Sequence, residues 1–447
     1  MKEKKYLIET FGCQMNVHDS EKIAGMLINL GYNETLKKDD ANIVVFNTCC
    51  IRESAELKIM AKIGELKALK RKNKDLIIVV CGCMTQQKNM PELLKKRFPF
   101  ISLIIGTHNI DELEDYLLEF ENDKKMRSIV WEKEGTVKEN KSVYRTSKNN
   151  AWVNIMFGCN NFCTYCIVPF VRGRERSRQV KDIVEEVAEL VKSGKYNTIT
   201  LLGQNVNSYG KDLEGGKTNF VNLLEEICKI EGDYKIKFLT SHPKDFSNEL
   251  VDFIAKSDKM SKAIHLPVQS GSDIVLKMMN RHYDITHYKN LVEKIYSTIP
   301  NATLTTDIIV GFPSESDEDF EKTCELLKFC NFSGVFGFVY SKRKGTPAEN
   351  FENQVSPKEK QRRITKLFEI QHELLRTQLK NMIGQTYETT IESKNGELFM
   401  AKTDNGKSIR VKSNDININD KCFVTATKIE NNELFGEVMK EKTDARK

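Results

Sequence analysis

Short apolar runs alternate with helical patterns over most of this chain of 447 residues, and this alternation restricts the possible folds more than any other feature. Between residue 5 and about residue 128, five strand-like stretches are separated by amphipathic stretches. One of these, DSEKIAGMLINLG, begins with residues suited to a helix N-cap and ends at Gly31. Strands and helices in regular succession predict a parallel sheet with helices on both faces.

The alternation starts again after a polar segment without periodicity, at residues 129–148. Six strand-like stretches follow, and the helical patterns between them, such as DIVEEVAELVKSG, have one apolar face. The six stretches are AWVNIMFG, TITLLGQN, KIKFLTSH, KAIHLPVQ, TLTTDIIVGF and GVFGFVYS. Six such units are fewer than the eight of a complete barrel. The sequence therefore predicts a partial (βα)6 barrel with its chemistry at the carboxyl ends of the strands.

The last part of the chain has a different pattern. A long helical pattern runs from Pro357 to Ile383, and short strand-like stretches follow it. Two of their connections, KNGE and DNGK, have Asn-Gly at the centre, as tight hairpins do. These stretches predict a small antiparallel β-barrel, an architecture that often contacts RNA. We therefore expect an α/β chain with a parallel sheet domain at 1–128, a linker at 129–148, the partial barrel with its trailing helix at 149–380 and the small barrel at 381–447.

The sequence predicts a globular protein in the cytoplasm. The amino-terminal apolar stretch is too short for the core of a signal peptide, and nowhere do about 18 apolar residues follow one another, so we expect no membrane segment. Twelve cysteines are many for a compartment in which thiols stay reduced, which favours metal binding or redox chemistry. The net charge of +6 is small, but three basic runs would suit a polyanion such as RNA; each run alone fits a solvated helix face equally well. The runs are Lys67–Lys74, Arg172–Arg178 and Lys358–Lys366.

Three cysteines lie in one loop directly after the first strand of the sixfold repeat. The sequence CNNFCTYC gives them the spacing C-x3-C-x2-C. Three thiolates can bind three irons of a [4Fe–4S] cube and leave the fourth iron open to a substrate or cofactor. A structural zinc site would need a fourth ligand, and no further Cys or His is close in the sequence. The loop therefore favours an iron–sulfur site formed by Cys159, Cys163 and Cys166.

A second set of cysteines lies at the ends of strands in the first sheet, in FGCQMN, FNTCC and VCGCM. The loops at the carboxyl ends of neighbouring parallel strands converge on one crevice, so thiolates from distant parts of the chain can meet there. A single buried thiol is common without any function, but three strand ends in succession favour a ligand set. The pattern alone leaves open whether Cys49 or Cys50, and whether Cys81 or Cys83, is the ligand.

The longer motifs resemble those of the methylthiotransferases, a family of radical S-adenosylmethionine (SAM) enzymes. The resemblance covers almost the whole chain, and FGCQMN and IRESAE resemble the MiaB branch of the family. The order of the domains is also similar: a methylthiotransferase domain, a radical SAM barrel and a TRAM barrel that binds RNA. The motifs are FGCQMNVHDSE, NTCCIRESAE, CGCMTQ, CNNFCTYCIVPFVRGRERSR, LLGQNVNSYG, FLTSHP, HLPVQSGS, DIIVGFPSE and YSKRKGTPA.

This resemblance implies a transferase that converts N6-isopentenyladenosine beside the tRNA anticodon into its 2-methylthio derivative by radical substitution at C2–H. It implies SAM and two [4Fe–4S] clusters as cofactors, one to cleave SAM and an auxiliary one to carry the sulfur. The implied partners are the tRNA anticodon stem-loop, a reduced electron donor such as flavodoxin or ferredoxin, and a sulfur donor. The alternatives are the sister branch that acts on threonylcarbamoyladenosine and, in a different class, a zinc-stabilised RNA-binding protein without catalytic activity.

Carried over by position, the resemblance assigns Cys13, Cys49 and Cys83 to the auxiliary cluster, and Cys159, Cys163 and Cys166 to the SAM cluster. The family usually has Ser where this chain has Cys50, so we expect Cys50 to be a bystander. Candidates for contact with SAM or the target base, each equally explained by structural hydrogen bonds, are Tyr165, Gln204, Asn205, Ser241, Gln269 and Asp307. Candidates for RNA contact are Arg172, Arg174, Arg362 and Arg363, and no catalytic side chain is assigned.

Overall fold

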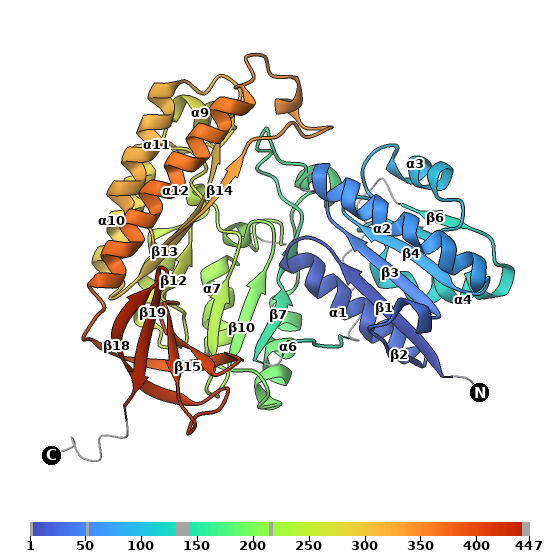
Figure 1. Cartoon of the computed structure of the whole chain (residues 1–447), viewed down its shortest axis with the longest axis horizontal. Coiled ribbons are helices and arrows are strands. Elements are labelled where there is room, and N and C mark those ends of the chain that lie inside the picture. The colour runs from blue at the N-terminus through green and yellow to red at the C-terminus, as the bar shows by residue number, and fades with distance from the viewer. Residues whose placement is uncertain (1–2, 51–52, 131–142, 148, 214–217, 440–447) are drawn as a thin grey trace.

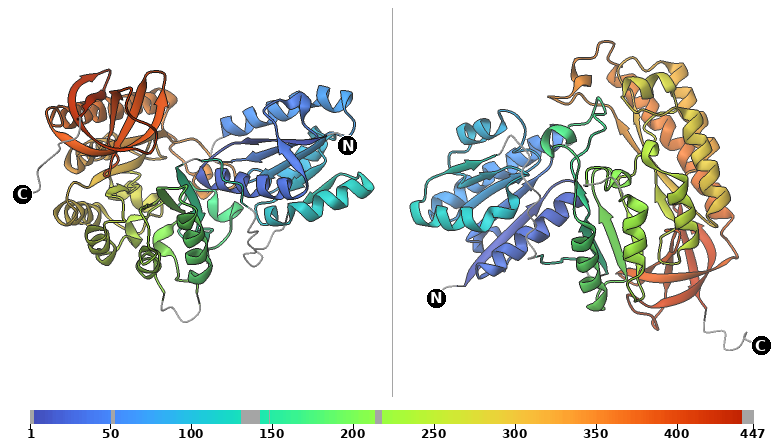
Figure 2. Two further views of the ribbon diagram at one scale, coloured as in Figure 1. Left: turned by 90° about the horizontal axis from the view of Figure 1, so that it is seen from below. Right: turned by 180° about the vertical axis from the view of Figure 1, so that it is seen from behind.

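The computed structural model describes residues 3–50, 53–130, 143–147, 149–213 and 218–439. Three units follow one another: a helix-covered sheet, a partial barrel and a small closed barrel (Figure 1). The sheet lies beside the first strands of the partial barrel, and the closed barrel lies at one end of it (Figures 1 and 2). The expected fold class is confirmed. Within the described ranges, no helix is both long and apolar enough to span a bilayer.

The amino-terminal unit is a sheet in the order β2-β1-β3-β4-β5-β6, and every pairing described in it is parallel. Alternate residues of β3 pack on opposite faces: Val44 and Phe46 toward α2 and α3, Ile43 and Val45 toward α1 and α4. Helices therefore cover both faces, which is why β3 and β4 are buried along their whole length. The strands are β1 Lys4–Thr10, β2 Tyr32–Glu34, β3 Ile43–Thr48, β4 Ile77–Gly82, β5 Leu103–Ile105 and β6 Arg127–Ile129, and the helices are α1 Gln14–Asn29, α2 Glu53–Lys72, α3 Met90–Arg97 and α4 Leu113–Asp123.

The central unit contains the six predicted parallel strands, but they do not form one continuous sheet. They form two sheets, β11-β10-β7 and β12-β13-β14. The described connection between these sheets is a single parallel bridge from Ile236 to Met260. The strands are β7 Asn150–Asn154, β10 Thr198–Leu202, β11 Lys235–Phe238, β12 Ala263–His265, β13 Thr303–Val310 and β14 Gly334–Val339. The outer helices are α6 Val180–Lys192, α7 Phe220–Cys228, α8 Asn248–Lys256, α9 Asp273–Met278, α10 Ile285–Thr298 and α11 Asp317–Cys330.

The barrel wall has an apolar outer face and a more polar inner face. On β13, Leu304 and Ile308 join the core beneath the helices, whereas Thr305 and Asp307 are partly exposed on the opposite face. This alternation follows from the two-residue period of a strand. Thr305 and Asp307 therefore lie on the inner face of the wall.

A long helix connects the partial barrel to the closed barrel. α12 (Pro357–Lys380) begins at an N-cap, where the Ser356 hydroxyl accepts a hydrogen bond from the Glu359 amide. The closed barrel has the order β15-β16-β17-β19-β18, and its pairings are antiparallel except for the parallel pair β17–β19. Its strands are β15 Thr386–Asn395, β16 Leu398–Thr403, β17 Ser408–Lys412, β18 Lys421–Glu430 and β19 Glu433–Val438.

The closed barrel docks on the amino ends of the partial-barrel strands. Lys235 of β11 pairs with Asp404 at 2.8 Å. The Asn405 side-chain amide donates to the Asn301 carbonyl at 2.9 Å, and the Thr303 hydroxyl donates to the Asn405 carbonyl. These residues of the closed barrel come from its DNGK hairpin. The hairpin therefore closes the end of the partial barrel opposite to the carboxyl ends of its strands.

Candidate functional site

The C-x3-C-x2-C loop connects two short strands that pair with each other beside the first barrel strand. β8 (Met156–Phe157) pairs with β9 (Arg176–Ser177), and the cysteines and the short helix α5 (Val168–Val171) lie between them. Gly158 begins the loop with a φ of 75°, and a Cβ atom there would lie 1.9 Å from the carbonyl oxygen of Arg174. Only glycine fits this position without moving the backbone.

Backbone contacts hold this loop in place. The Cys159 amide donates to the Gly173 carbonyl at 3.0 Å, and the Thr164 amide donates to the Met279 carbonyl at 3.1 Å. Asn280, just beyond α9, donates from its side chain to two loop carbonyls at 3.1 Å each. The loop is therefore clamped by a segment more than a hundred residues away in sequence.

A buried arginine accompanies the three loop thiols. One terminal nitrogen of Arg281 lies 3.6 Å from the Cys163 sulfur, and the other donates to the Pro267 carbonyl at 2.7 Å. Burial and, to a smaller extent, the neighbouring Cys163 raise the pKa of Cys159 to about 11 and that of Cys166 to about 12. Thiols with such raised pKa values become thiolates only when cationic metal compensates the charge. Three thiols in one loop suit bound iron, because each can bind a different iron of a cube.

The second cysteine set meets at the carboxyl edge of the amino-terminal sheet. Cys13 lies at the start of α1, Cys49 follows β3 and Cys83 follows β4. A Cβ atom at Gly12 would lie 2.6 Å from the Cβ of Cys49, so the loops after β1 and β3 are in contact. Burial raises the pKa of Cys13, the Arg172 guanidinium opposes the shift, and the nearby Cys83 thiol adds to it. Three strand-end loops therefore bring the three expected thiols together.

Cys50 and Cys81 have different surroundings. The buried Cys50 thiol is hydrogen-bonded to Cys83, which raises the pKa of Cys50 and lowers that of Cys83. Cys50 is thus a direct neighbour of Cys83, an expected ligand, although the sequence predicted no role for it. Cys81 packs on the other face of the sheet, in the apolar layer beneath α1 and α4, where burial raises its pKa. This position makes Cys81 a core thiol.

The segment that follows the cysteine loop packs against the amino-terminal unit. Ile167 and Val171, which follow Cys166 in the chain, pack in the same apolar core as Cys50 and Cys83. Apolar side chains therefore form part of the contact between the two units, beside the buried ion pair of Arg172 and Asp19.

Two of the arginines predicted to contact RNA are buried. Arg172 donates to the Cys83 sulfur at 3.3 Å and pairs with Asp19 at 2.7 Å. Arg363 of α12 pairs with the buried Glu315 at 2.7 Å. A buried and paired guanidinium cannot reach a phosphate at the surface, so the prediction of RNA contact is wrong for Arg172 and Arg363. Each of them joins two elements of the fold instead.

The other two arginines are exposed. The Arg174 guanidinium lies over the Phe162 ring, 4.3 Å from its centroid. Arg362 pairs with Glu359 at 2.6 Å and with Asp317 at 2.8 Å. Both remain at the surface, where a phosphate could approach them.

Buried polar atoms without partners gather at the carboxyl ends of the barrel strands. Among the described residues these include both side-chain polar atoms of Asn154 and the side-chain oxygens of Gln204 and Asn205. After β11, the Ser241 hydroxyl and Nε2 of His242 are also buried without a hydrogen-bond partner. Burial lowers the pKa of His242, so its ring is neutral; Nδ1 accepts from the Lys244 amide, and Nε2 therefore carries the hydrogen and can donate. Since buried polar groups are normally hydrogen-bonded, these atoms fit a polar ligand with both donors and acceptors, as SAM is.

The remaining predicted ligand residues lie on the second sheet and next to it. The backbone amide of Gln269 donates to the backbone carbonyl of Asp307 at 2.8 Å. Gln269 itself has a left-handed backbone, with a φ of 73°. The Asp307 carboxylate lies 3.6 Å from Nε2 of His265, and the His265 ring contacts Phe336 edge to face. Tyr165 packs on a separate small apolar cluster. Sequence reasoning missed His265, although the motif HLPVQSGS contains it.

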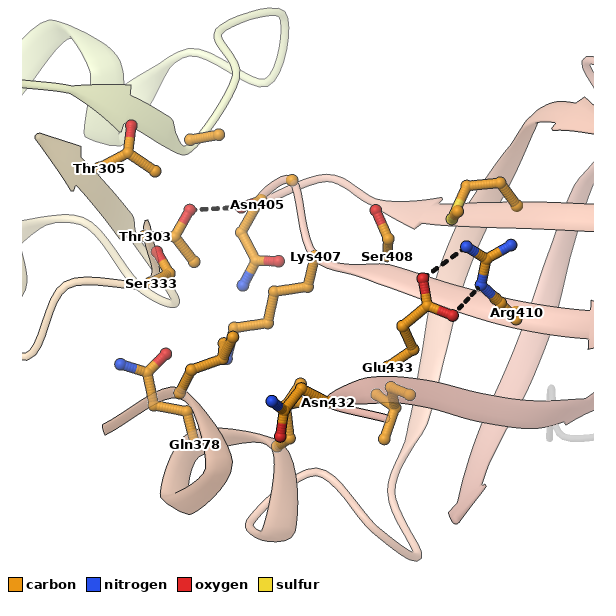
Figure 3. A pocket seen from close by; sticks show the side chains of 16 residues that line it. Thr303, Thr305, Ser333, Gln378, Asn405, Lys407, Ser408, Arg410, Asn432 and Glu433 are labelled. Carbon is orange, nitrogen blue, oxygen red and sulfur yellow. Dashed lines mark hydrogen bonds and ion pairs between the residues drawn. The ribbon is translucent and has the colours of Figure 1, made fainter. Parts of the chain in front are cut away.

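Two cavities border the partial barrel. One of about 240 Å³ lies beside the cysteine loop and is lined by Asn161 and Lys244, among others. Another, of about 270 Å³, lies at the opposite end, between the amino ends of β12 and β13 and the closed barrel (Figure 3). An ion pair between Arg410 and Glu433 borders it, with nitrogen–oxygen distances of 2.5 to 2.6 Å. The second cavity is therefore a feature of the docking surface, away from the cysteines.

Within the described ranges, no three His, Cys, Asp or Glu side chains are arranged to hold a single metal ion. A cube has a different requirement, because each thiolate binds a different iron. The residues present, three thiols per set with a guanidinium at one sulfur, are chemically suited to such a cluster.

Known proteins resemble this chain in sequence over almost its full length. The Radical SAM superfamily matches residues 153–327, and a family described as Uncharacterized protein family UPF0004 matches residues 5–106. The tRNA-2-methylthio-N(6)-dimethylallyladenosine synthase of Clostridium tetani is 49% identical, with 97% of this chain and 96% of that protein covered. The protein of the same name from Carboxydothermus hydrogenoformans is 49% identical, with 91% of each chain covered.

Solved structures resemble it in fold. The radical S-adenosylmethionine methyltransferase TsrM from Kitasatospora setae, with cobalamin and a [4Fe-4S] cluster bound, has a TM-score of 0.56 at 14% identity and covers 78% of this chain and 77% of that one. The cobalamin-dependent S-adenosylmethionine radical enzyme OxsB has a TM-score of 0.54 at 15% identity, covering 82% and 56%. At these identities the likeness concerns the fold alone.

Proposed function

This chain belongs to the family of the tRNA-2-methylthio-N6-dimethylallyladenosine synthases, which are radical SAM enzymes, and we propose that it attaches a methylthio group to C2 of N6-isopentenyladenosine beside the tRNA anticodon. The single observation that carries the proposal is the presence of two three-cysteine sets, one in each of two units that contact each other through Arg172 and Cys83. A zinc-stabilised RNA-binding protein would need neither the second set nor the polar atoms left without partners at the barrel mouth.

The radical SAM family uses SAM and an iron–sulfur cluster. Cys159, Cys163 and Cys166 would hold that cluster, and Cys13, Cys49 and Cys83 would hold a second one. Three thiols in each set leave one iron of each cube without a protein ligand. When bound, these cofactors would supply an electron, a carbon radical and the transferred sulfur and methyl group.

The chain's own residues would orient and shield the reactants. Arg281 holds Cys163 by a hydrogen bond, and Arg172 holds Cys83 in the same way. The polar atoms of Asn154, Ser241 and His242 would bind the polar groups of SAM or of the target base. The apolar packing at the junction would keep water away from reactive species.

The substrate RNA must present its base to the barrel mouth. A base inside a stacked anticodon loop cannot enter, so we infer that it is splayed out, as for other base-modifying enzymes. The closed barrel, residues 381–447, and the exposed Arg174 and Arg362 would contact the RNA backbone. A cytoplasmic location, a reduced electron donor such as flavodoxin or ferredoxin, and a sulfur donor complete the proposal.

Mass spectrometry of tRNA nucleosides from cells with and without the protein tests the activity. Loss of the 2-methylthio group together with accumulation of isopentenyladenosine is the expected result. A changed threonylcarbamoyladenosine pool with an unchanged isopentenyladenosine pool would place the chain in the sister branch instead.

Iron content tests the two cysteine sets. Anaerobically purified protein is expected to hold about eight irons per chain, and about four after either set of three cysteines is changed to Ala. Protein that contains zinc and no iron would contradict the assignment.

A further inference from the structure

Arg172 lies at the junction of the two cysteine sets and is bound to one of them. It follows α5, on the barrel side of the junction, and its Nε donates to the Cys83 sulfur of the amino-terminal sheet at 3.3 Å. A terminal nitrogen of the same guanidinium pairs with Asp19 of α1 at 2.7 Å, and each of these two side chains is only 6% exposed. One further thiol, that of Cys13, also faces the guanidinium.

Arg281 makes the corresponding contact in the other set, but without an acid. One of its terminal nitrogens lies 3.6 Å from the Cys163 sulfur, and its other nitrogens donate to the Pro267 carbonyl and the Tyr283 hydroxyl. In the part of the chain that the structure describes, no carboxylate pairs with Arg281. Each set therefore has one buried guanidinium beside one sulfur. Of the two, only the guanidinium of Arg172, beside Cys83, is paired with a carboxylate, that of Asp19.

We propose that Arg172 and Asp19 are positioning residues that together set the reduction potential of the cluster held through Cys83. This inference rests on the proposed function, because it requires a cluster at the second set. A hydrogen bond and a positive charge at a ligating sulfur stabilise the reduced, more negative form of a cluster and so raise its potential. Asp19 places a negative charge beside that positive charge and limits the rise.

The two residues should therefore act in opposite directions. Neutralising Asp19 leaves the guanidinium charge unbalanced beside the sulfur, which favours the reduced cluster. Removing the guanidinium leaves the Asp19 charge unbalanced, which disfavours it. Residues with a purely structural role would not produce shifts of opposite sign.

The test is a redox titration followed by electron paramagnetic resonance. It uses the full-length protein with Cys159, Cys163 and Cys166 changed to Ala, so that one cluster remains. Asp19→Asn is expected to shift the midpoint potential to a more positive value, and Arg172→Met to a more negative one. The double variant Asp19→Asn/Arg172→Met is expected between Arg172→Met and the parent, because it carries no unbalanced charge.

The outcomes separate this inference from the proposed function. Midpoints that do not move, or that move in the same direction in both single variants, would overturn the role of the pair even if the enzyme makes its product. If Arg172→Met holds no iron, Asp19→Asn alone decides, and a negative or absent shift contradicts the inference. Expected potentials without any 2-methylthio product would refute the function and leave the inference standing. A parent protein without iron would overturn both.

Discussion

At the scale of single residues, the start of the SAM-cluster loop depends on the missing side chain of Gly158. Gly158→Ala would place a Cβ atom 1.9 Å from the Arg174 carbonyl oxygen, at a φ of 75°. The loop must then move, and we expect iron to fall from about eight to about four per chain, measured on anaerobically purified protein.

Gly194→Ala is the matched control. Gly194 also has a positive φ, 66°, but no atom lies within 4 Å of the position of its Cβ. Both variants carry the left-handed backbone penalty of about 1–2 kcal/mol, so only the clash differs. Full iron content in Gly158→Ala would show that the loop does not need this close approach.

The adjacent pair Cys49 and Cys50 gives a second prediction. Cys49→Ala is expected to remove the second cluster, since it would remove a ligand. Cys50→Ser keeps a hydrogen-bond donor beside Cys83, so iron content should stay near that of the parent. The measurement is iron per chain, and loss of four irons in Cys50→Ser would show that the wrong thiol was assigned.

Sequence reasoning reached the cysteines but not the arginines that support them. The cysteines have a visible spacing, or lie at strand ends, and the resemblance names them. Arg172 looked like one member of a basic run, because a sequence does not show that Asp19 and Cys83 bury it. The polar atoms of Asn154 and His242 were invisible for the same reason: their lack of partners is a property of the folded barrel mouth.

At the scale of elements, a buried ion pair joins α12 to the barrel, beside the apolar packing of Ile364 and Leu367. Arg363→Met would leave Glu315 buried without its partner, and we expect a loss of about 3–5 kcal/mol in the free energy of unfolding, measured by denaturant titration. Arg362→Met, one position away on the exposed face, should cost at most about 1 kcal/mol. Equal losses in the two variants would contradict the assigned role of Arg363.

Most elements were predictable because their patterns are long and periodic. The six barrel strands and the long helix were confirmed, with α12 ending at Lys380 rather than at Ile383. The short β2 and β9 were missed, since strands of two or three residues carry no periodic signal, and the predicted strand AWVNIMFG is divided into β7 and β8. The break between β11 and β12 depends on the curvature of the assembled wall, which local pattern does not encode.

At the scale of the whole molecule, the two Asn-Gly hairpins of the closed barrel have different surroundings. Asn405 of DNGK bonds to Asn301, whereas no atom lies within 4 Å of the Cβ position of Gly396 in KNGE. Asn405→Ala is therefore expected to loosen the docking and to speed amide hydrogen exchange at the amino ends of β12 and β13. Asn395→Ala, in the KNGE hairpin, should leave that exchange unchanged, and equal effects would contradict the docking role.

The sequence predicted three units but not how they meet. Their docking rests on contacts between residues far apart in the chain, such as Arg172 with Cys83 and Lys235 with Asp404. The first contact joins the amino-terminal sheet to the segment after the cysteine loop, and the second places the closed barrel at the amino ends of the barrel strands.

The central claim is that both cysteine sets are needed for one reaction. The most direct test is mass spectrometry of nucleosides after anaerobic incubation of reduced, iron- and sulfide-reconstituted protein with SAM and tRNA that contains isopentenyladenosine. The full chain should yield the 2-methylthio nucleoside, and Cys83→Ala and Cys163→Ala should each yield none. Undiminished product from either variant would contradict the account.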